Sequence, residues 1–276
     1  MGNVIAFWSP RHGQAGNSSN MVAAAAVLAM DYVSHTLAAH THYGISMVEN
    51  AFLRNQRATE NRSASYSAQG IDSLDTLARS KQLTPSVIKD YAVPVFNGSL
   101  DVLAGTQKPE EDLFLKMHEV TGSICQAARS AYDLTLIDVN SGCRNVLTNA
   151  VLESADMVVV SLSQNLSLLR EFFEHPPAFL EGKKYIIVLG QYDAGSRLTL
   201  GNIRRLFRTR IPIFAVPHNS SYMDACNEHK VVEFFLKRKH INAVQPDYAF
   251  MQEIRRLARG IYEGLAVDPN MYAKEA

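Results

Sequence analysis

The residues best suited to chemistry lie in the stretch from Val4 to Ala29. An apolar run of strand length, Val4 to Trp8, is followed by a loop with two glycines, and Asn17-Ser18-Ser19 then leads into an alanine-rich helix. The first turn of a helix has free backbone N–H groups and carries the positive end of the helix dipole. This order of strand, glycine-containing turn and helix predicts a phosphate-binding loop, in which Ser18 or Ser19 would bind Mg²⁺ or cap the helix.

The spacing departs from the common phosphate-loop pattern G-x-x-x-x-G-K-[ST]. Arg11 stands at the first glycine and Asn17 replaces the lysine, while Gly16 and Ser18 are kept. On this loop alone, a plain strand–turn–helix with an N-cap is an equally good interpretation. Arg11 is the better candidate for a phosphate contact than His12, because its guanidinium is fully charged and can bind in a bidentate manner.

A second informative stretch runs from Ala131 to Gly142. Leu134 to Ile137 predict a buried strand that ends in Asp138. A carboxylate at the C-terminal end of a central strand, next to a phosphate loop, would hold Mg²⁺ through its water shell. Asn140-Ser141-Gly142 would then respond to the γ-phosphate. The alternative is an ordinary turn or N-cap aspartate.

Strand-like runs alternate with helical patterns along the chain, which predicts one α/β domain with three layers and a mostly parallel sheet. About seven strands are expected, near Val4, Ser34, Leu100, Leu134, Val158, Ile186 and Ile213. Residues 91–96 also have the pattern of a short strand. Helices are expected over residues 18–32, 110–130, 143–154, 163–175, 199–207, 231–239 and 246–265. A helical insertion is expected at about 43–92, with helices at 47–54, 71–81 and 85–91 and a mobile loop or poorly anchored helix at 56–69.

Composition narrows the class of protein. The chain has 276 residues, of which 47% are hydrophobic and 20% charged, and 27 Lys and Arg balance 27 Asp and Glu. Zero net charge gives no general attraction to nucleic acid or to an anionic membrane. The longest apolar run, Met21 to Met30, is too short to span a bilayer, and no signal peptide is visible. Three widely spaced cysteines form neither a disulfide framework nor a zinc site, so a cytoplasmic protein is expected.

The loop resembles the deviant phosphate loop of the ParA/MinD family of ATPases, K-G-G-x-G-K-[ST]-[ST]. His12 falls at the signature lysine and Asn17 at the phosphate lysine, while Gly13, Gly16 and the Ser18-Ser19 pair match the pattern. The size of the chain and the order of its elements are similar to those of the family over nearly all 276 residues. Within the family, the WSP-x-HGQ-x-G type of loop resembles the TadZ/CpaE-like branch, which localises pilus and secretion machinery.

The resemblance implies ATP or ADP and Mg²⁺ as ligands. Gln191 would contact the adenine through its amide, Pro217 would lie against the base, and Ser18 and Asp138 would hold the metal. The loop residues implied in nucleotide binding are Arg11, His12, Gly13, Gln14, Ala15, Gly16, Asn17, Ser18 and Ser19. No catalytic residue is assigned: both lysines are absent, and His40-Thr41-His42 stands where the family has an acidic switch. ATP hydrolysis is therefore expected to be slow or absent.

Three hypotheses about function follow. The first is a dimeric, nucleotide-dependent localisation factor for pilus, secretion or conjugation machinery, recruited to the membrane or cell pole through a protein partner. The second is a pseudo-ATPase scaffold that binds no nucleotide. The third, a small-molecule enzyme, would have to use His40, His42 and Asp138, and these histidines lack further ligands for a zinc site. The arginine cluster at 204–210 could bind DNA, although zero net charge favours a solvated face.

Overall fold

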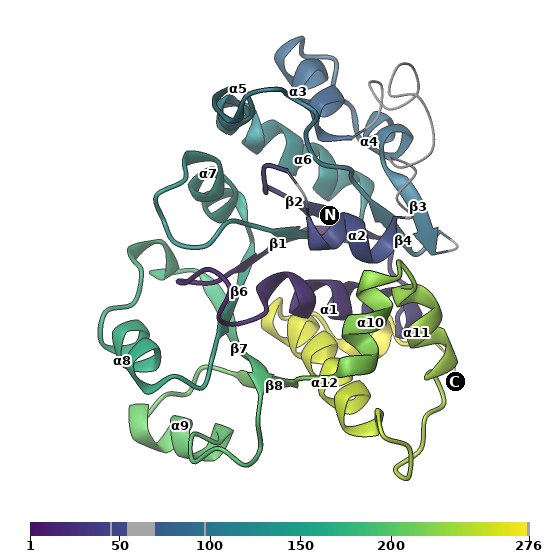
Figure 1. The fold of residues 1–276 in the computed structure, drawn as a ribbon. Coiled ribbons are helices and arrows are strands. Elements are labelled where there is room, and N and C mark those ends of the chain that lie inside the picture. Colours follow the sequence, from purple (N-terminus) through teal and green to yellow (C-terminus); the bar gives the residue numbers. More distant parts are fainter. Residues whose placement is uncertain (45, 54–69, 97, 275–276) are drawn as a thin grey trace.

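The computed structural model describes residues 1–44, 46–53, 70–96 and 98–274. These residues form one sheet with helices on both faces (Figure 1). The sheet has eight strands in the order β3-β4-β2-β5-β1-β6-β7-β8. Their bounds are β1 Asn3–Trp8, β2 Thr36–His40, β3 Val93–Phe96, β4 Leu100–Val102, β5 Leu134–Asp138, β6 Met157–Leu162, β7 Lys184–Tyr192 and β8 Ile213–Pro217.

The mostly parallel sheet of a three-layer α/β domain is confirmed. Neighbouring strands are parallel except β3, which pairs antiparallel with β4 at the edge. The sheet has one strand more than the expected count of about seven, because β3, from the short strand pattern at 91–96, also pairs into it.

Strand β1 lies in the middle of the sheet, between β5 and β6. Its residues alternate between the two faces: Ile5 and Phe7 belong to one core cluster, and Val4, Ala6 and Trp8 to the other. Both faces are fully buried, which explains why β1 is a continuous apolar run rather than an alternating one.

Two layers of helices cover the sheet (Figure 1). One face carries α1 (Asn17–Asp31), α2 (Met47–Phe52), α10 (Ser220–Asn227), α11 (Val231–Lys237) and α12 (Tyr248–Gly264). The other carries α3 (Ile71–Arg79), α4 (Pro85–Tyr91), α5 (Glu111–Leu115), α6 (Thr121–Ala131), α7 (Val146–Ser154), α8 (Leu166–Glu174) and α9 (Leu200–Phe207). The four alanines at 23–26 of α1 are almost wholly buried, because small side chains let this helix approach the sheet closely.

The helix predicted over 110–130 is wrong as one element. It is divided into α5, a 3₁₀ turn over Lys116–Glu119, and α6. The break falls at Val120, whose φ of −115° and ψ of 1° are not helical, and Thr121 Oγ1 donates to the Met117 carbonyl across it. Helix α10 was not expected from the sequence. It begins at an N-cap, where Asn219 accepts a hydrogen bond from the Tyr222 N–H.

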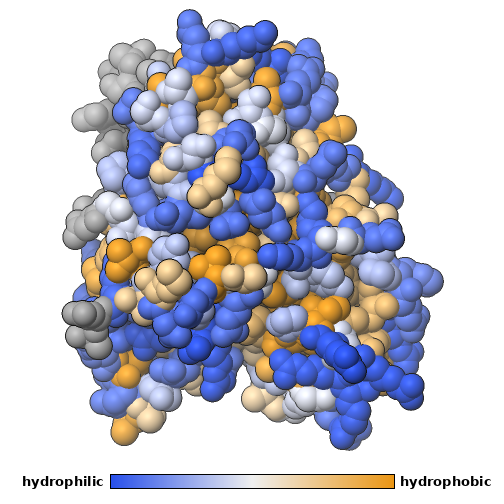
Figure 2. Space-filling view, turned by 180° about the vertical axis from the view of Figure 1, so that it is seen from behind, coloured by the Kyte–Doolittle hydropathy of each residue, from blue (hydrophilic) through white to orange (hydrophobic). Residues whose placement is uncertain are grey.

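Helices α2, α3 and α4 fall within residues 43–92, and their status as an insertion stays a prediction. The loop predicted at 56–69 lies outside the described residues. Among the residues that are described, no helix is both long and apolar enough to cross a membrane. On the rear face of the molecule, hydrophilic residues separate the apolar clusters (Figure 2).

Candidate functional site

The loop after β1 is joined to the loop after β5. The Trp8 indole Nε1 donates to the Gly142 carbonyl at 2.8 Å, and the Gly142 N–H donates to the Ser9 carbonyl at 3.0 Å. These bonds hold residues 9–16 beside the C-terminal end of β5. The phosphate-type loop predicted after β1 and the aspartate predicted at the end of β5 are therefore neighbours.

Two glycines give this loop its shape. Gly13 and Gly16 have φ of 73° and 58°, a left-handed conformation that other residues adopt at a cost. Gly16 directly precedes α1, so the loop turns sharply into the helix N-terminus. Residues 11–14 are exposed to solvent.

The base of the loop is anchored to the interior. Ala15 is buried, and its carbonyl accepts a hydrogen bond from Asn20 Nδ2 at 2.9 Å. Gly190 of β7 lies against the same carbonyl, since a Cβ at this position would stand 1.8 Å from the oxygen. The glycine is therefore required for β7 to support the loop.

Asn17 points inward rather than toward the open side of the loop. Its Nδ2 donates to the Phe7 carbonyl at 2.8 Å and to Asp138 Oδ1 at 2.7 Å. Its Oδ1 is buried without a hydrogen-bond partner among the described atoms. The side chain that replaces the expected lysine thus fastens α1 to β1 and β5.

Asp138 lies at the end of β5 with its side chain fully buried. Its second oxygen, Oδ2, is 2.9 Å from Nε2 of His42, which follows β2. Burial alone would lower the pKa of His42, but the hydrogen bond and charge of Asp138 outweigh it and raise that pKa above its ordinary value. The contact of His42 with Asp138 was not predicted. The signal for it is that β2 and β5 are adjacent, which places residues just beyond both strand ends side by side.

A cavity of about 220 Å³ opens between the loop, β5 and α10. It is smaller than the roughly 300–1,000 Å³ usual for drug-sized ligands, so it suits a phosphate chain with the rest of a nucleotide lying outside. Its lining contains every predicted loop residue except Gln14, and also Gln191 and Asp138; Pro217 is not part of it. Ser141, from the stretch predicted to respond to the γ-phosphate, also lines it. So do five residues that the sequence did not single out as nucleotide ligands: Ser9, His42, Met47, Val139 and Met223.

Arg11 and Gln191 have partners within the chain. The Arg11 guanidinium pairs with the Glu171 carboxylate of α8 at 2.9 Å, and both side chains are more than half exposed. Such an exposed pair is worth little, so a phosphate could replace the carboxylate at small cost. Gln191 has a φ of 52° at an irregularity between β7 and β8. Its Oε1 is 2.9 Å from His218 Nδ1, and its amide lies over Gly16.

Of the two predicted magnesium ligands, Asp138 is already engaged by groups of the same chain. Asp138 is the one carboxylate among the described residues that line the cavity, and both of its oxygens already accept hydrogen bonds. Over the described parts of the chain, no group of three or more His, Cys, Asp or Glu is placed to hold a metal. Mg²⁺ usually takes one or two protein oxygens together with phosphates and waters, so on the protein side its site would depend on Ser18 and Asp138.

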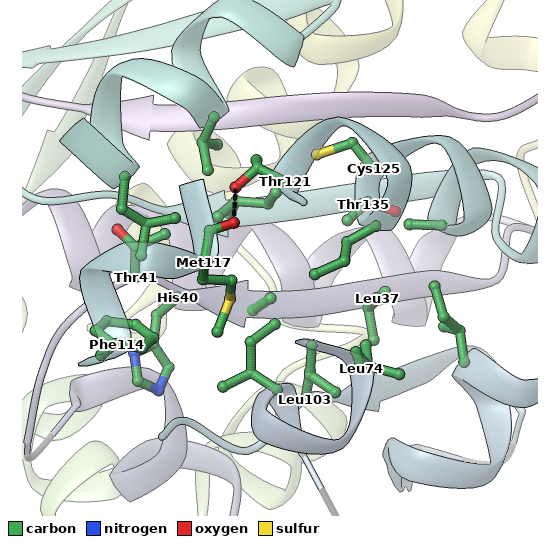
Figure 3. Close-up of a pocket in the computed structure, with 18 residues that line it drawn as sticks. Leu37, His40, Thr41, Leu74, Leu103, Phe114, Met117, Thr121, Cys125 and Thr135 are labelled. Carbon is green, nitrogen blue, oxygen red and sulfur yellow. Dashed lines mark hydrogen bonds between the residues drawn. The ribbon is translucent and has the colours of Figure 1, made fainter. Parts of the chain in front are cut away.

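A second cavity lies between the sheet and helices α3 and α6 (Figure 3). It measures about 50 Å³ and is lined almost entirely by apolar side chains, among them Leu74 and Phe114, with His40 and Thr41 at one end. A space of this size and polarity is a packing gap of the core rather than a reaction site.

Comparison with known proteins supports the fold but names no closer relative. No family model and no curated protein matches this sequence. Among solved structures, a ParA family ATPase from Chlorobium tepidum superimposes with a TM-score of 0.69 at 19% identity, covering 94% of this chain and 99% of that one. MinD from Pyrococcus horikoshii, complexed with Mg-ADP, gives 0.66 at 13% identity and covers 95% and 96%.

A plasmid partition protein from Borrelia burgdorferi bound to AMPPNP gives a TM-score of 0.55 at 13% identity, covering 86% of this chain and 100% of that one. The predicted resemblance is thus confirmed for the fold, which is that of the ParA and MinD ATPases. These comparisons do not address the narrower resemblance to the TadZ/CpaE-like branch.

Proposed function

We propose that this chain binds ATP or ADP at the loop after β1 and acts as a dimeric localisation factor rather than as a fast ATPase. The observation that carries this proposal is the left-handed glycine loop at the N-terminus of α1, open on a cavity of phosphate-chain size. Two solved proteins with this fold are described as complexes with Mg-ADP and AMPPNP. The backbone N–H groups of residues 13–18 would bind the phosphates.

Slow hydrolysis is part of the proposal. Asn17 stands where the family has the phosphate lysine, and its amide is committed to Phe7 and Asp138. No cation therefore reaches the phosphates from this position of α1. Loss of one preorganised electrostatic contact typically costs about 3–4 kcal/mol at the transition state, a factor of several hundred in rate.

The finer parts of the proposal follow from the resemblance. Nucleotide would stabilise a homodimer, and the dimer would recruit a protein of a pilus, secretion or conjugation assembly, as in the TadZ/CpaE-like branch. Of the predicted base contacts, Gln191 lines the cavity, whereas Pro217 lies beside it at the end of β8. Mg²⁺ on Ser18 and Asp138 remains the sequence prediction, and the contacts of Asp138 are the observation against it.

DNA binding by the arginine cluster is not included. Arg204 donates to the Ile213 carbonyl and Arg205 to Asn202 Oδ1, so two of the four arginines serve contacts within the domain.

The test is calorimetric titration with ADP and AMPPNP, together with thermal unfolding. Ligand at a hundredfold excess over Kd should stabilise the fold by about 2.7 kcal/mol. The Gly13→Ala variant should weaken binding about tenfold or more, because alanine disfavours the left-handed backbone of the loop. Gly182→Ala is the matched control: this glycine has φ of 71° against 73° for Gly13, both are exposed, and an added Cβ would meet nothing within 4 Å at either.

Absence of binding to either nucleotide would favour the second candidate, a scaffold without nucleotide. The ion pair of Arg11 with Glu171 is the observation consistent with that candidate, because the arginine at the rim of the cavity already has an anionic partner within the chain. Equal weakening by Gly13→Ala and Gly182→Ala would place the ligand elsewhere.

A further inference from the structure

The carboxylate of Asp138 already accepts hydrogen bonds from two side chains of the same chain. Asn17 Nδ2 lies 2.7 Å from Oδ1, and His42 Nε2 lies 2.9 Å from Oδ2. The carboxylate itself has no exposed surface, and His42 is about one-fifth exposed. Each oxygen keeps a second lone pair, but the donor already bound to it reduces the negative charge that the carboxylate offers to a cation from the cavity.

The imidazole of His42 is held in place by a second histidine. Its ring stacks on that of His40, with centroids 5.9 Å apart and an interplanar angle of 24°. The backbone N–H of His42 donates to His40 Nδ1 at 3.2 Å. His40 is in turn fully buried, with its Nε2 3.2 Å from Glu49 Oε1, and Glu49 also accepts from the Gly105 N–H. Moving His42 away from Asp138 would disturb this buried array.

The remaining charges of the cavity suit an anion. Besides Asp138, its charged or basic lining residues are Arg11, His12 and His42. Phosphate oxygens would meet an arginine, two imidazoles and the N-terminus of α1. A divalent cation would find no free carboxylate among these described residues.

We infer that the cavity binds the phosphate chain of its nucleotide without a divalent cation, with Asn17 and His42 donating to Asp138 where a metal-dependent site would keep the carboxylate free. This inference rests on the proposed nucleotide binding. It assigns to Asn17 and His42 the role of positioning residues that keep Asp138 out of metal coordination.

The test is calorimetric titration of ADP into the whole chain, with excess EDTA in one series and with MgCl₂ in the other. The expected result is a Kd that differs by less than about threefold between the two series. Binding that is more than about threefold tighter with Mg²⁺ would overturn the inference while leaving the proposed function intact. No heat of binding in either series would overturn the proposed function itself, and with it this inference.

A metal readout without nucleotide tests the positioning role. Mn²⁺ titrated into the wild-type chain and followed by electron paramagnetic resonance should remain free. The His42→Ala variant removes the donor from Oδ2 and should gain Mn²⁺ affinity and a Mg²⁺-dependent Kd for ADP. His42→Gln keeps a side-chain amide donor and should behave like the wild type. Mn²⁺ binding by the wild-type chain that Asp138→Ala abolishes would overturn the inference, and this arm holds even if the His42 variants fail to fold.

Discussion

The amide of Asn17 fastens the first helix to the sheet through two hydrogen bonds, and its removal has a calculable cost. The Asn17→Ala variant removes the side-chain donor from Asp138 Oδ1 and one of two donors from the Phe7 carbonyl, which keeps the Val139 N–H. A hydrogen bond to a charged group contributes about 1.5–3 kcal/mol and one to a neutral carbonyl about 0.5–1.5 kcal/mol. Asn17→Ala should therefore lower the free energy of unfolding by about 2–4 kcal/mol.

A double-mutant cycle isolates the contact with Asp138. The single variants Asn17→Ala and Asp138→Ala and the double variant should give a coupling energy of about 1.5–3 kcal/mol, because the double variant no longer contains the carboxylate oxygen that Asn17→Ala leaves without its donor. The measurement is guanidinium-induced unfolding without nucleotide, followed by circular dichroism and by fluorescence of Trp8. Coincident transitions from the two probes would justify a two-state treatment.

The matched control is Asn149→Ala combined with Asp138→Ala. Asn149 also donates through Nδ2 to a carbonyl, that of Cys143, but makes no contact with Asp138 in the described structure. Its effect should add to that of Asp138→Ala within about 0.5 kcal/mol. A coupling for the Asn17 pair no larger than this control would refute the assignment of Asn17 as the residue that fastens α1 to β5.

Three further predictions concern other parts of the chain. Gly190→Ala should cost about 1–3 kcal/mol of stability and weaken ADP binding, because its methyl group would overlap the Ala15 carbonyl at the base of the loop. The control is Gly122→Ala, at an exposed helical site where an added Cβ meets nothing within 4 Å. This variant should leave ADP binding unchanged and stabilise the fold by up to about 1 kcal/mol. Partial burial alone would raise the pKa of Asp247, but hydrogen bonds from Asn219 and Arg238 lower it. The wild-type chain should therefore be more stable than Asp247→Asn at pH 7. Urea unfolding should show that this difference in stability shrinks as the pH falls through the native pKa of Asp247. Burial raises the pKa of the Cys125 thiol in α6 and of the Cys226 thiol in α10 to about 11, whereas Cys143 is exposed. Mass spectrometry after iodoacetamide treatment of the native chain should therefore find Cys143 modified first. Faster labelling of Cys125 or Cys226 would contradict their burial.

The sequence was most informative where one local pattern determines one element. Apolar runs predicted the central strands because a buried parallel strand must be apolar on both faces. The helix predicted over 246–265 has its apolar residues at helical spacing, and Phe250, Ile254, Leu257 and Ile261 of α12 are all buried. The relation of the first loop to Asp138 was likewise predictable, since both follow strands that end at the same edge of the sheet.

What the sequence did not reveal depends on which strands become neighbours. His42 meets Asp138 because β2 pairs with β5, although 96 positions separate the two residues. The inward direction of the Asn17 amide and the ion pair of Arg11 with Glu171 likewise depend on tertiary distances. A single sequence carries no local signal for such contacts, so the identity of the groups that compensate Asp138 came only from the structure.

The position of β1 in the middle of the sheet has a consequence for how the chain is made. Its partners β5 and β6 end at residues 138 and 162, so the apolar residues 4–8 of β1 leave the ribosome long before either neighbour exists. At about 5–20 residues per second, β5 is complete roughly 6–26 s after β1, and β6 roughly 8–30 s after it. Until β5 is made, the nascent β1 segment has no neighbouring strand on either edge. A chaperone that covers this segment during translation should therefore raise the yield of native protein more than a chaperone that acts after the chain has left the ribosome.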